Sequence, residues 1–311
     1  MIVKPEKMNF ANKNLIMIVS GLPGTGKTTL ALSAPDVLLI DTDEGLCRVN
    51  PAHRKDASIC KTYEEILADV KSAEGEYKTI VIDTAGALID YIKDWAVRTD
   101  PKASKSGGGI SLQGFGIVKQ EFLRLSNELR KKFNVIYLFH EQLEKNNEDV
   151  FYSLVCEGSA RTLVYQPADL AAHLFIQNGQ RYLGFTPTEQ YTAKGAYGIK
   201  GLVQIPELKE GQPNNFLANL FATVRKNLEA EGGKLSAEKK AYDEVMEWGF
   251  ALIGSIDCTE AVSVVLDQIN GHKHVLTSKA ELLAALKEKL NREGIVYDKA
   301  TGGYVYKKTL V

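Results

Sequence analysis

The sequence predicts an α/β protein: a mainly parallel sheet with an antiparallel hairpin at one edge, followed by a small, mainly helical C-terminal region. Three observations predict this fold class. Short apolar runs alternate with helical patterns in the first part of the chain. An Asn-Gly turn then separates two further apolar runs, and the rest of the chain keeps helical periodicity almost to its end.

The parallel sheet is predicted by short runs rich in Val, Ile and Leu, each bounded by polar residues or glycine. These runs lie at residues 15–19, 37–40, 79–82 and 135–139. Between them, residues 62–75 and 115–132 carry apolar side chains at helical spacing, and the first of these segments starts with the capping box Thr62-x-x-Glu65. Strands that alternate with helices indicate parallel pairing.

The edge hairpin is predicted by Asn178-Gly179, the strongest short hairpin signal, between two apolar runs. We therefore expect the core to occupy residues 1–205. The polar segment 206–214 contains Pro and Gly and is the expected linker, and residues 215–311 form the expected helical region, ending in a short hairpin. Helical patterns in this region lie at 215–230, 236–253, 259–269 and 278–294.

Composition limits the possible partners. The chain has 311 residues, with 38 Lys plus Arg against 39 Asp plus Glu. Because the charges nearly balance, any nucleic-acid contact must come from a local basic patch. The four cysteines form no C-x-x-C pair, which argues against a zinc site or disulfide scaffold. No run has the roughly 20 apolar residues of a membrane span, and no signal peptide is evident, so we expect a cytoplasmic protein without a membrane partner.

Residues 21–28 read GLPGTGKT and match the phosphate-binding pattern G-x-x-x-x-G-K-[ST]. The segment lies between an apolar strand and a helix-forming run, where its glycines let backbone N–H groups surround a triphosphate. Lys27 is expected on the β- and γ-phosphates of ATP and Thr28 on Mg²⁺. The expected nucleotide-binding residues are Gly21, Pro23, Gly24, Thr25, Gly26, Lys27, Thr28 and Thr29.

Asp83 ends the strand predicted at 79–82, so its carboxylate belongs at the same sheet edge as the phosphate loop. We expect it to be the magnesium-side acid, although a strand-end Asp is also common as a helix cap. Residues 83–86, Asp-Thr-Ala-Gly, look like the D-x-x-G switch of small GTPases. No N-K-x-D tetrad follows, so guanine recognition is a minor alternative.

Five sequence blocks between residues 15 and 201 together resemble the RecA-like ATPases. Within them, the chain is most similar to phage-encoded "AAA domain" nucleotide-binding proteins and Sak-type single-strand annealing proteins. The resemblance implies a RecA-like core that hydrolyses ATP with Mg²⁺. The blocks are GLPGTGKTTLA, VLLIDTDEGL, TIVIDTAGALID, NVIYLFHEQ and GSARTLVYQPADLAAHLF.

The resemblance also implies catalytic roles outside the phosphate loop. In this family the second strand ends in an acid that polarises the attacking water, and here Asp43 holds that place while Glu44 follows one residue late. Either can be the base, and a solvated acidic turn is the alternative. His140 falls where the family places a sensor of the γ-phosphate, and a hydrogen-bonded structural histidine is the other interpretation.

Further implied roles concern partners. The basic, Gly-rich segment 101–116 occupies the place of the first DNA-binding loop, where Lys102 and Lys105 would meet phosphates, unless it is only a surface loop. The second DNA-binding loop would correspond to 142–149, which is short and acidic. Lys194 resembles the lysine that reaches a neighbouring subunit's γ-phosphate, although the usual second basic residue is missing and a solvated lysine is the alternative.

The expected function is therefore a Mg-ATP-dependent ATPase that acts on single-stranded DNA in phage-type recombination or strand annealing. Self-association into a ring or filament, a single-strand-binding protein partner and a host-cytoplasm location are expected with it. A slow ATP-dependent protein-interaction switch without DNA activity is the alternative. A small-molecule kinase is a weaker one, because no arginine lies in an evident lid motif.

Overall fold

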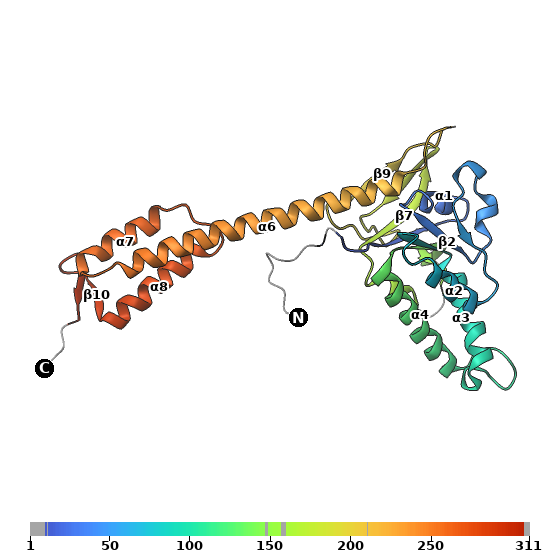
Figure 1. The fold of residues 1–311 in the computed structure, drawn as a ribbon, viewed down its shortest axis with the longest axis horizontal. Helices are drawn as coiled ribbons and strands as arrows, with labels where there is room; N and C mark the ends of the chain where they lie inside the picture. The colour runs from blue at the N-terminus through green and yellow to red at the C-terminus, as the bar shows by residue number, and fades with distance from the viewer. Residues whose placement is uncertain (1–9, 11, 147–148, 157–159, 210, 308–311) are drawn as a thin grey trace. The chain divides into compact units, whose positions relative to one another are not determined.

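The computed structural model describes residues 10, 12–146, 149–156, 160–209 and 211–307 (Figure 1). The chain divides into two compact units. One spans Ala11–Asn227, and the other contains the chain from Leu228 onward. The division falls within helix α6 (Phe216–Gly254), and residues 206–214 lie inside the first unit, between its last strand and this helix. The assignment of an ATPase core to 1–205 and a separate region to 215–311 stays a prediction.

The first unit is built on one mixed sheet whose strands run in the order β3-β2-β4-β5-β1-β7-β8-β9, with β6 paired to β5. Pairing is parallel from β3 to β7 and antiparallel in the β7–β8, β8–β9 and β5–β6 pairs. The α/β fold with an antiparallel edge hairpin is confirmed. The strands are β1 (Ile16–Gly21), β2 (Val37–Asp41), β3 (Ala57–Ser58), β4 (Thr79–Asp83), β5 (Asn134–Asn146), β6 (Asp149–Leu154), β7 (Leu170–Gln177), β8 (Gln180–Gly184) and β9 (Leu202–Ile205).

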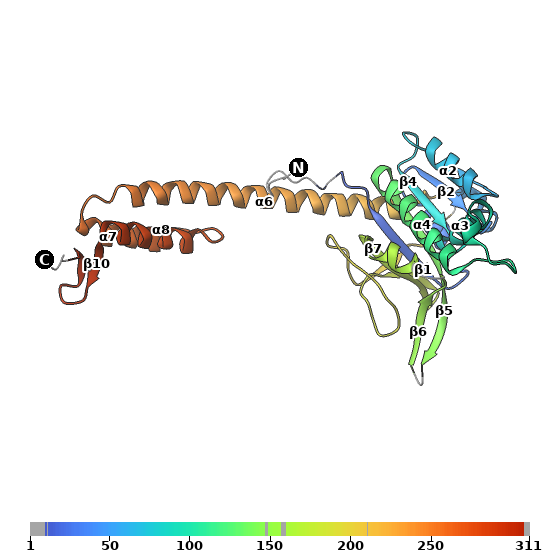
Figure 2. The same ribbon diagram turned by 90° about the horizontal axis from the view of Figure 1, so that it is seen from below.

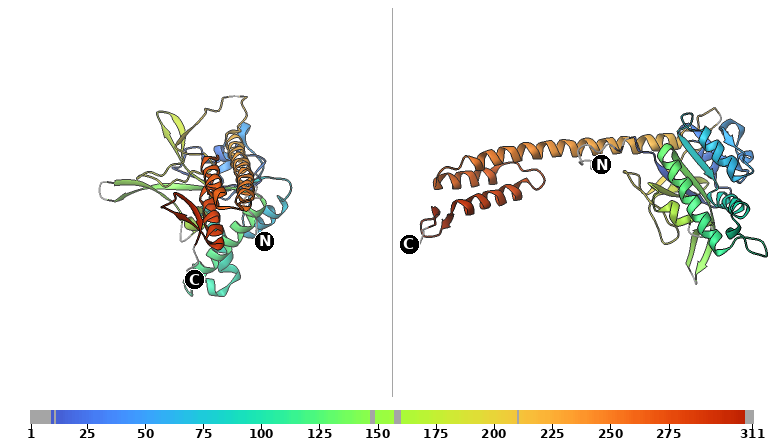
Figure 3. Two further views of the ribbon diagram at one scale, coloured as in Figure 1. Left: turned by 90° about the vertical axis from the view of Figure 1, so that its left-hand side faces the viewer. Right: turned by 60° about the horizontal axis from the view of Figure 1, so that its bottom comes forward.

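Helices α2, α3 and α4 gather on one side of this sheet (Figure 2, Figure 3). Their apolar faces share one core with alternate strand residues, because successive strand side chains point to opposite faces. Ile66, Ile92 and Phe122 are fully buried there. The helices of this unit are α1 (Lys27–Ala31), α2 (Tyr63–Ser72), α3 (Ala85–Thr99), α4 (Leu112–Lys132), α5 (Ala160–Tyr165) and the first part of α6.

Two features of this unit differ from the expected pattern. Helix α3 was not predicted; Thr84 caps it, since its Oγ1 accepts a hydrogen bond from Ala87 N at 3.3 Å. Strand β5 runs past its apolar part and pairs with β6, so most of the expected second DNA-binding loop at 142–149 is a β-hairpin. Residues 147–148 of that segment lie outside the described residues.

The second unit contains the later part of α6, α7 (Thr259–Gly271), α8 (Ser278–Glu293) and the hairpin β10 (Ile295–Asp298) and β11 (Gly303–Tyr306), around its own apolar core. The helices expected at 215–230 and 236–253 are one helix, because Gly232-Gly233 weakens a helix by about 1 kcal/mol per residue without blocking it. Helix α8 ends at Glu293, and Gly294, with φ 68°, caps it. Among the described residues, no helix has the length and apolar character needed to cross a membrane.

Candidate nucleotide site

The phosphate loop connects the end of β1 to the start of α1. Gly24 and Gly26 have φ angles of 81° and 98°, a region that favours glycine. Gly21 is required for space, since a Cβ there would lie 2.5 Å from the carbonyl oxygen of Leu174. The pairing of β1 with β5 places Gly21 opposite His140, so the loop and the end of β5 share one edge of the sheet.

Lys27 is the buried cation of this loop, with 5% of its surface exposed. Its Nζ donates hydrogen bonds to the carbonyl oxygens of Gly21 at 2.9 Å and Leu22 at 3.0 Å. Burial lowers the pKa of this amine, while the nearby carboxylates of Asp83, Glu141 and Asp43 act in the opposite direction. A partly desolvated ammonium held inside the loop is suited to bind phosphate oxygens.

Thr28 and Asp83 form the pair expected to hold the metal. Thr28 Oγ1 donates to Asp83 Oδ2 at 2.6 Å, and Asp83 is 3% exposed. Burial raises the pKa of Asp83, and the hydrogen bond from Thr28 opposes that shift. Mg²⁺ prefers oxygen ligands and takes one or two from a protein beside substrate phosphates, so this hydroxyl–carboxylate pair fits it. No cluster of three or more His, Cys, Asp or Glu that could hold a metal occurs in the described part of the chain.

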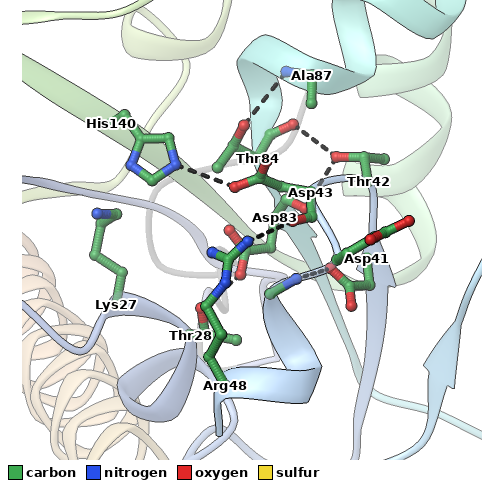
Figure 4. A network of polar contacts seen from close by, with 12 residues as sticks. Lys27, Thr28, Asp41, Thr42, Asp43, Arg48, Asp83, Thr84, Ala87 and His140 are labelled. Carbon is green, nitrogen blue, oxygen red and sulfur yellow. Dashed lines mark hydrogen bonds and ion pairs between the residues drawn. The ribbon is translucent and has the colours of Figure 1, made fainter. Parts of the chain in front are cut away.

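The turn after β2 brings further acids to this edge (Figure 4). Asp41 lies opposite Asp83 in the sheet and accepts hydrogen bonds from Gly45 N at 2.7 Å and Leu46 N at 3.0 Å, so it holds the turn in shape. Gly45 lies close to the Thr28–Asp83 pair, since a Cβ there would lie 3.1 Å from Asp83 Oδ2 and 3.5 Å from Thr28 Oγ1.

Asp43 and Glu44 take different positions in this turn. Asp43 Oδ2 lies 3.2 Å from His140 Nε2, and both residues line the phosphate cavity. Glu44 has φ 50° and an exposed side chain, and it is not among the cavity-lining residues. His140 Nδ1 is buried without a hydrogen-bond partner among the described residues. Asp43 therefore lines the cavity and Glu44 does not, whereas the sequence offered no basis for choosing between them.

The phosphate cavity has a volume of about 170 Å³. Eight of the predicted residues line it: Gly24, Gly26, Lys27, Thr28, Thr29, Asp43, Asp83 and His140. Sequence reasoning missed three residues that line the cavity, namely Gly45, Arg48 and Val49, and also Asp41, which holds the turn beside it. The signal for Asp41 was available, because it is the acid that directly ends the apolar run 37–40.

The remaining predicted residues lie elsewhere. Lys102 and Lys105 are exposed in the loop between α3 and α4, which is closed by a bridge between Ser104 and Ile110. Lys194 Nζ donates to the carbonyl oxygen of Ala168, after the end of α5, in its own chain. None of these three lysines lines the phosphate cavity.

A phosphate loop between β1 and α1, an acid at the end of β4, and β5 between these two strands together form the arrangement of a P-loop nucleotide-binding domain. A protein-family model described as "AAA domain" matches residues 13–197. This is more than half of the chain, and the chain belongs to that family.

Two solved structures are similar to parts of the chain. An ATPase from the type III secretion system of pathogenic bacteria is 13% identical, with a TM-score of 0.34 and 52% of each chain covered. The flagellar accessory protein FlaH from Methanocaldococcus jannaschii is 13% identical, with a TM-score of 0.28, covering 63% of this chain and 91% of FlaH. The chain thus spans about half the length of the first structure. No curated protein sequence matches it.

Proposed function

We propose that the chain hydrolyses Mg-ATP and uses this cycle to act on single-stranded DNA in phage-type recombination or strand annealing. The observation that carries the ATPase proposal is the convergence of the Thr28–Asp83 pair, Lys27 and the Asp43–His140 pair on one cavity. The DNA proposal is supported by the sequence resemblance and by the exposed basic loop that contains Lys102 and Lys105.

Each residue has one task in the proposed mechanism. Lys27 neutralises the β- and γ-phosphates, and Thr28 with Asp83 would hold Mg²⁺, which supplies electrostatic stabilisation of the developing phosphate charge. Asp43 polarises the attacking water as general base. His140 Nε2 orients the Asp43 carboxylate, and its buried Nδ1 would respond to the γ-phosphate.

Asp43 is the better candidate for the base. Its carboxylate lines the cavity that contains Lys27, whereas Glu44 is exposed outside it. A general base must come within hydrogen-bond reach of the water that it activates, directly or through one further water. The position of Asp43 therefore favours it as the general base over Glu44, which has the side chain that is usual in the family.

Self-association into a ring or filament is part of the proposal. Lys194 is the candidate for a cation supplied to a neighbouring subunit, because cations supplied in trans complete many P-loop sites. For this, its Nζ would have to leave the carbonyl oxygen of Ala168. A single-strand-binding protein is a further proposed partner, and a protein-interaction switch without DNA activity remains the second candidate function.

Asp83→Asn is expected to reduce kcat on the order of 10²-fold while ATP affinity changes less than tenfold, because the change misplaces the metal but leaves the backbone cradle intact. Steady-state turnover against Mg²⁺ concentration and ATP titration measure the two effects. Asp90→Asn, an exposed aspartate on α3, is the matched control. Wild-type turnover in Asp83→Asn would leave Asp83 with a structural role only.

Single-stranded DNA is expected to stimulate ATP turnover and to bind more tightly with ATP present. In Lys102→Ala/Lys105→Ala, the negative slope of log affinity against log salt is expected to become less steep by about 1.4, from two lost contacts at about 0.7 each. Filter binding of labelled single strands over a salt series measures this slope.

Lys71→Ala/Lys131→Ala removes two exposed lysines outside this loop and is the control, with an unchanged slope expected. Wild-type protein that hydrolyses ATP, binds no single strand and is not stimulated by it would reject the DNA role. That result would favour the protein-interaction switch.

A further inference from the structure

A second, larger cavity adjoins the phosphate cavity. Its volume is about 560 Å³, within the range of small-molecule pockets. The two cavities share Gly26 and Thr29, at the start of α1. Because the first turn of α1 borders both, a nucleotide with its phosphates on the loop can extend its other end into the larger cavity.

The walls of this cavity have mixed chemistry. Ile205, Leu208 and Phe216 supply apolar surface, and all three are half-buried. Exposed amide side chains also line it, from Gln212, Asn215 and Asn219. An apolar wall suits the face of a purine ring, and amides carry both donors and acceptors for base edges and ribose hydroxyls.

The connection from β9 to α6 forms much of this wall, and hydrogen bonds attach it to α1 and to Ser33 just after that helix. Asn214 Nδ2 donates to the carbonyl oxygen of Thr29 at 2.7 Å. At the start of α6, Leu217 N donates to Ser33 Oγ at 2.9 Å and Ala218 N donates to Ser33 O at 3.0 Å. The wall is therefore fixed relative to the helix that begins at the phosphate loop.

The edge hairpin attaches to the phosphate loop from the other side. Arg181 on β8 lines the larger cavity, and its Nε donates to the carbonyl oxygen of Thr25 at 3.0 Å. The same Nε lies 3.2 Å from the position of a Cβ at Gly26, so the guanidinium packs directly on the loop. A cation that the sequence did not assign thus stands where the two cavities meet.

We propose that the larger cavity binds the base and ribose of the nucleotide whose phosphates lie on residues 21–28, with Arg181 at the junction. The inference rests on the proposed ATPase function and adds a binding role for residues 205–208 and 212–216. Residues 206–208 and 212–214, from the segment expected as a linker, then form a wall of the nucleoside site. Inorganic tripolyphosphate has no nucleoside, so substitutions in this wall should not change its affinity.

The test compares Mg-ATP and Mg-tripolyphosphate binding by calorimetry. Ile205→Ala/Leu208→Ala is expected to weaken ATP at least about 10-fold through lost apolar contact and to change tripolyphosphate affinity less than twofold. Leu202→Ala/Ile176→Ala truncates two exposed aliphatic side chains on strands β9 and β7 and is the control, with both affinities unchanged. An unchanged ATP affinity in the cavity variant, or equal weakening of both ligands, would overturn the proposal.

A photolabel gives a readout that needs no substitution. With wild-type protein and 8-azido-ATP, peptide mapping is expected to find the label within 205–219 or at the opposite wall, 50–53. Label confined to 140–154 or to the second unit would place the base elsewhere and reject this cavity. If wild-type protein binds neither ATP nor tripolyphosphate, the proposed ATPase function itself fails, which is a distinct result.

Discussion

Lys27→Ala is expected to lower kcat at least about 10² to 10³-fold and to weaken ATP binding about 10- to 150-fold. The decrease in kcat corresponds to the loss of one preorganised hydrogen-bond donor to the charge that develops in the transition state. The decrease in ATP affinity corresponds to the loss of hydrogen bonds from a charged donor. Lys27 is the only lysine or arginine of the phosphate loop, residues 21–28. Arg48 also lines the phosphate cavity, but it comes from the turn after β2. Phosphate release and ATP titration measure the two effects.

The control for Lys27→Ala is Lys71→Ala, which removes an exposed lysine from the last turn of α2. Its turnover and affinity should match wild type. Thermal unfolding of both variants shows whether the fold survives, because Lys27 is buried and bonds two carbonyl oxygens of the loop. A folded Lys27→Ala protein with normal turnover would remove the basis of the proposed ATPase.

Asp43→Asn is expected to lower kcat about 10² to 10⁴-fold, the range of general acid–base catalysis, with ATP affinity kept within a few-fold. The amide keeps the size of the carboxylate and a partner for His140 Nε2, but it cannot accept a proton. Single-turnover hydrolysis separates this chemical step from nucleotide binding and product release.

Glu44→Gln is the matched comparison, because it makes the same chemical change one residue away. Its exposed side chain lies outside the phosphate cavity, so its turnover should stay within about threefold of wild type, as for surface changes away from a site. If Glu44→Gln stops hydrolysis and Asp43→Asn does not, the base is Glu44. If neither slows hydrolysis, the base lies elsewhere.

Sequence alone predicted the parts of the site that are local in the chain. The phosphate loop is specified by eight consecutive residues, 21–28, and Asp83 by its position at the end of a buried run. Parallel strands then bring Asp83 to the loop without further information, because their carboxyl ends share one edge. The edge hairpin was equally predictable from Asn178-Gly179.

Contacts between distant residues could not be predicted in this way. Asp43 lines the phosphate cavity and Glu44 does not, and the backbone at Glu44 is left-handed, with φ 50°, a conformation that a glutamate in the sequence does not predict. The contact of Arg181 with Thr25 joins residues 156 positions apart. The contribution of residues 206–208 and 212–214 to the larger cavity was not predicted, because a polar segment with Pro and Gly is typical of linkers.

Gly45 has a consequence for how this site can diverge between related proteins. Any side chain at this position would meet the Asp83 carboxylate and the Thr28 hydroxyl, which are on two other elements. A Cβ at residue 45 would lie 3.1 Å from Asp83 Oδ2, so the Asp83 carboxylate would have to move by a few tenths of an ångström, and the hydrogen bond from Thr28 Oγ1 to the same oxygen would move with it. The residue at position 45 therefore affects the geometry of Thr28 and Asp83, and relatives that lose this glycine should also differ at one of these two positions.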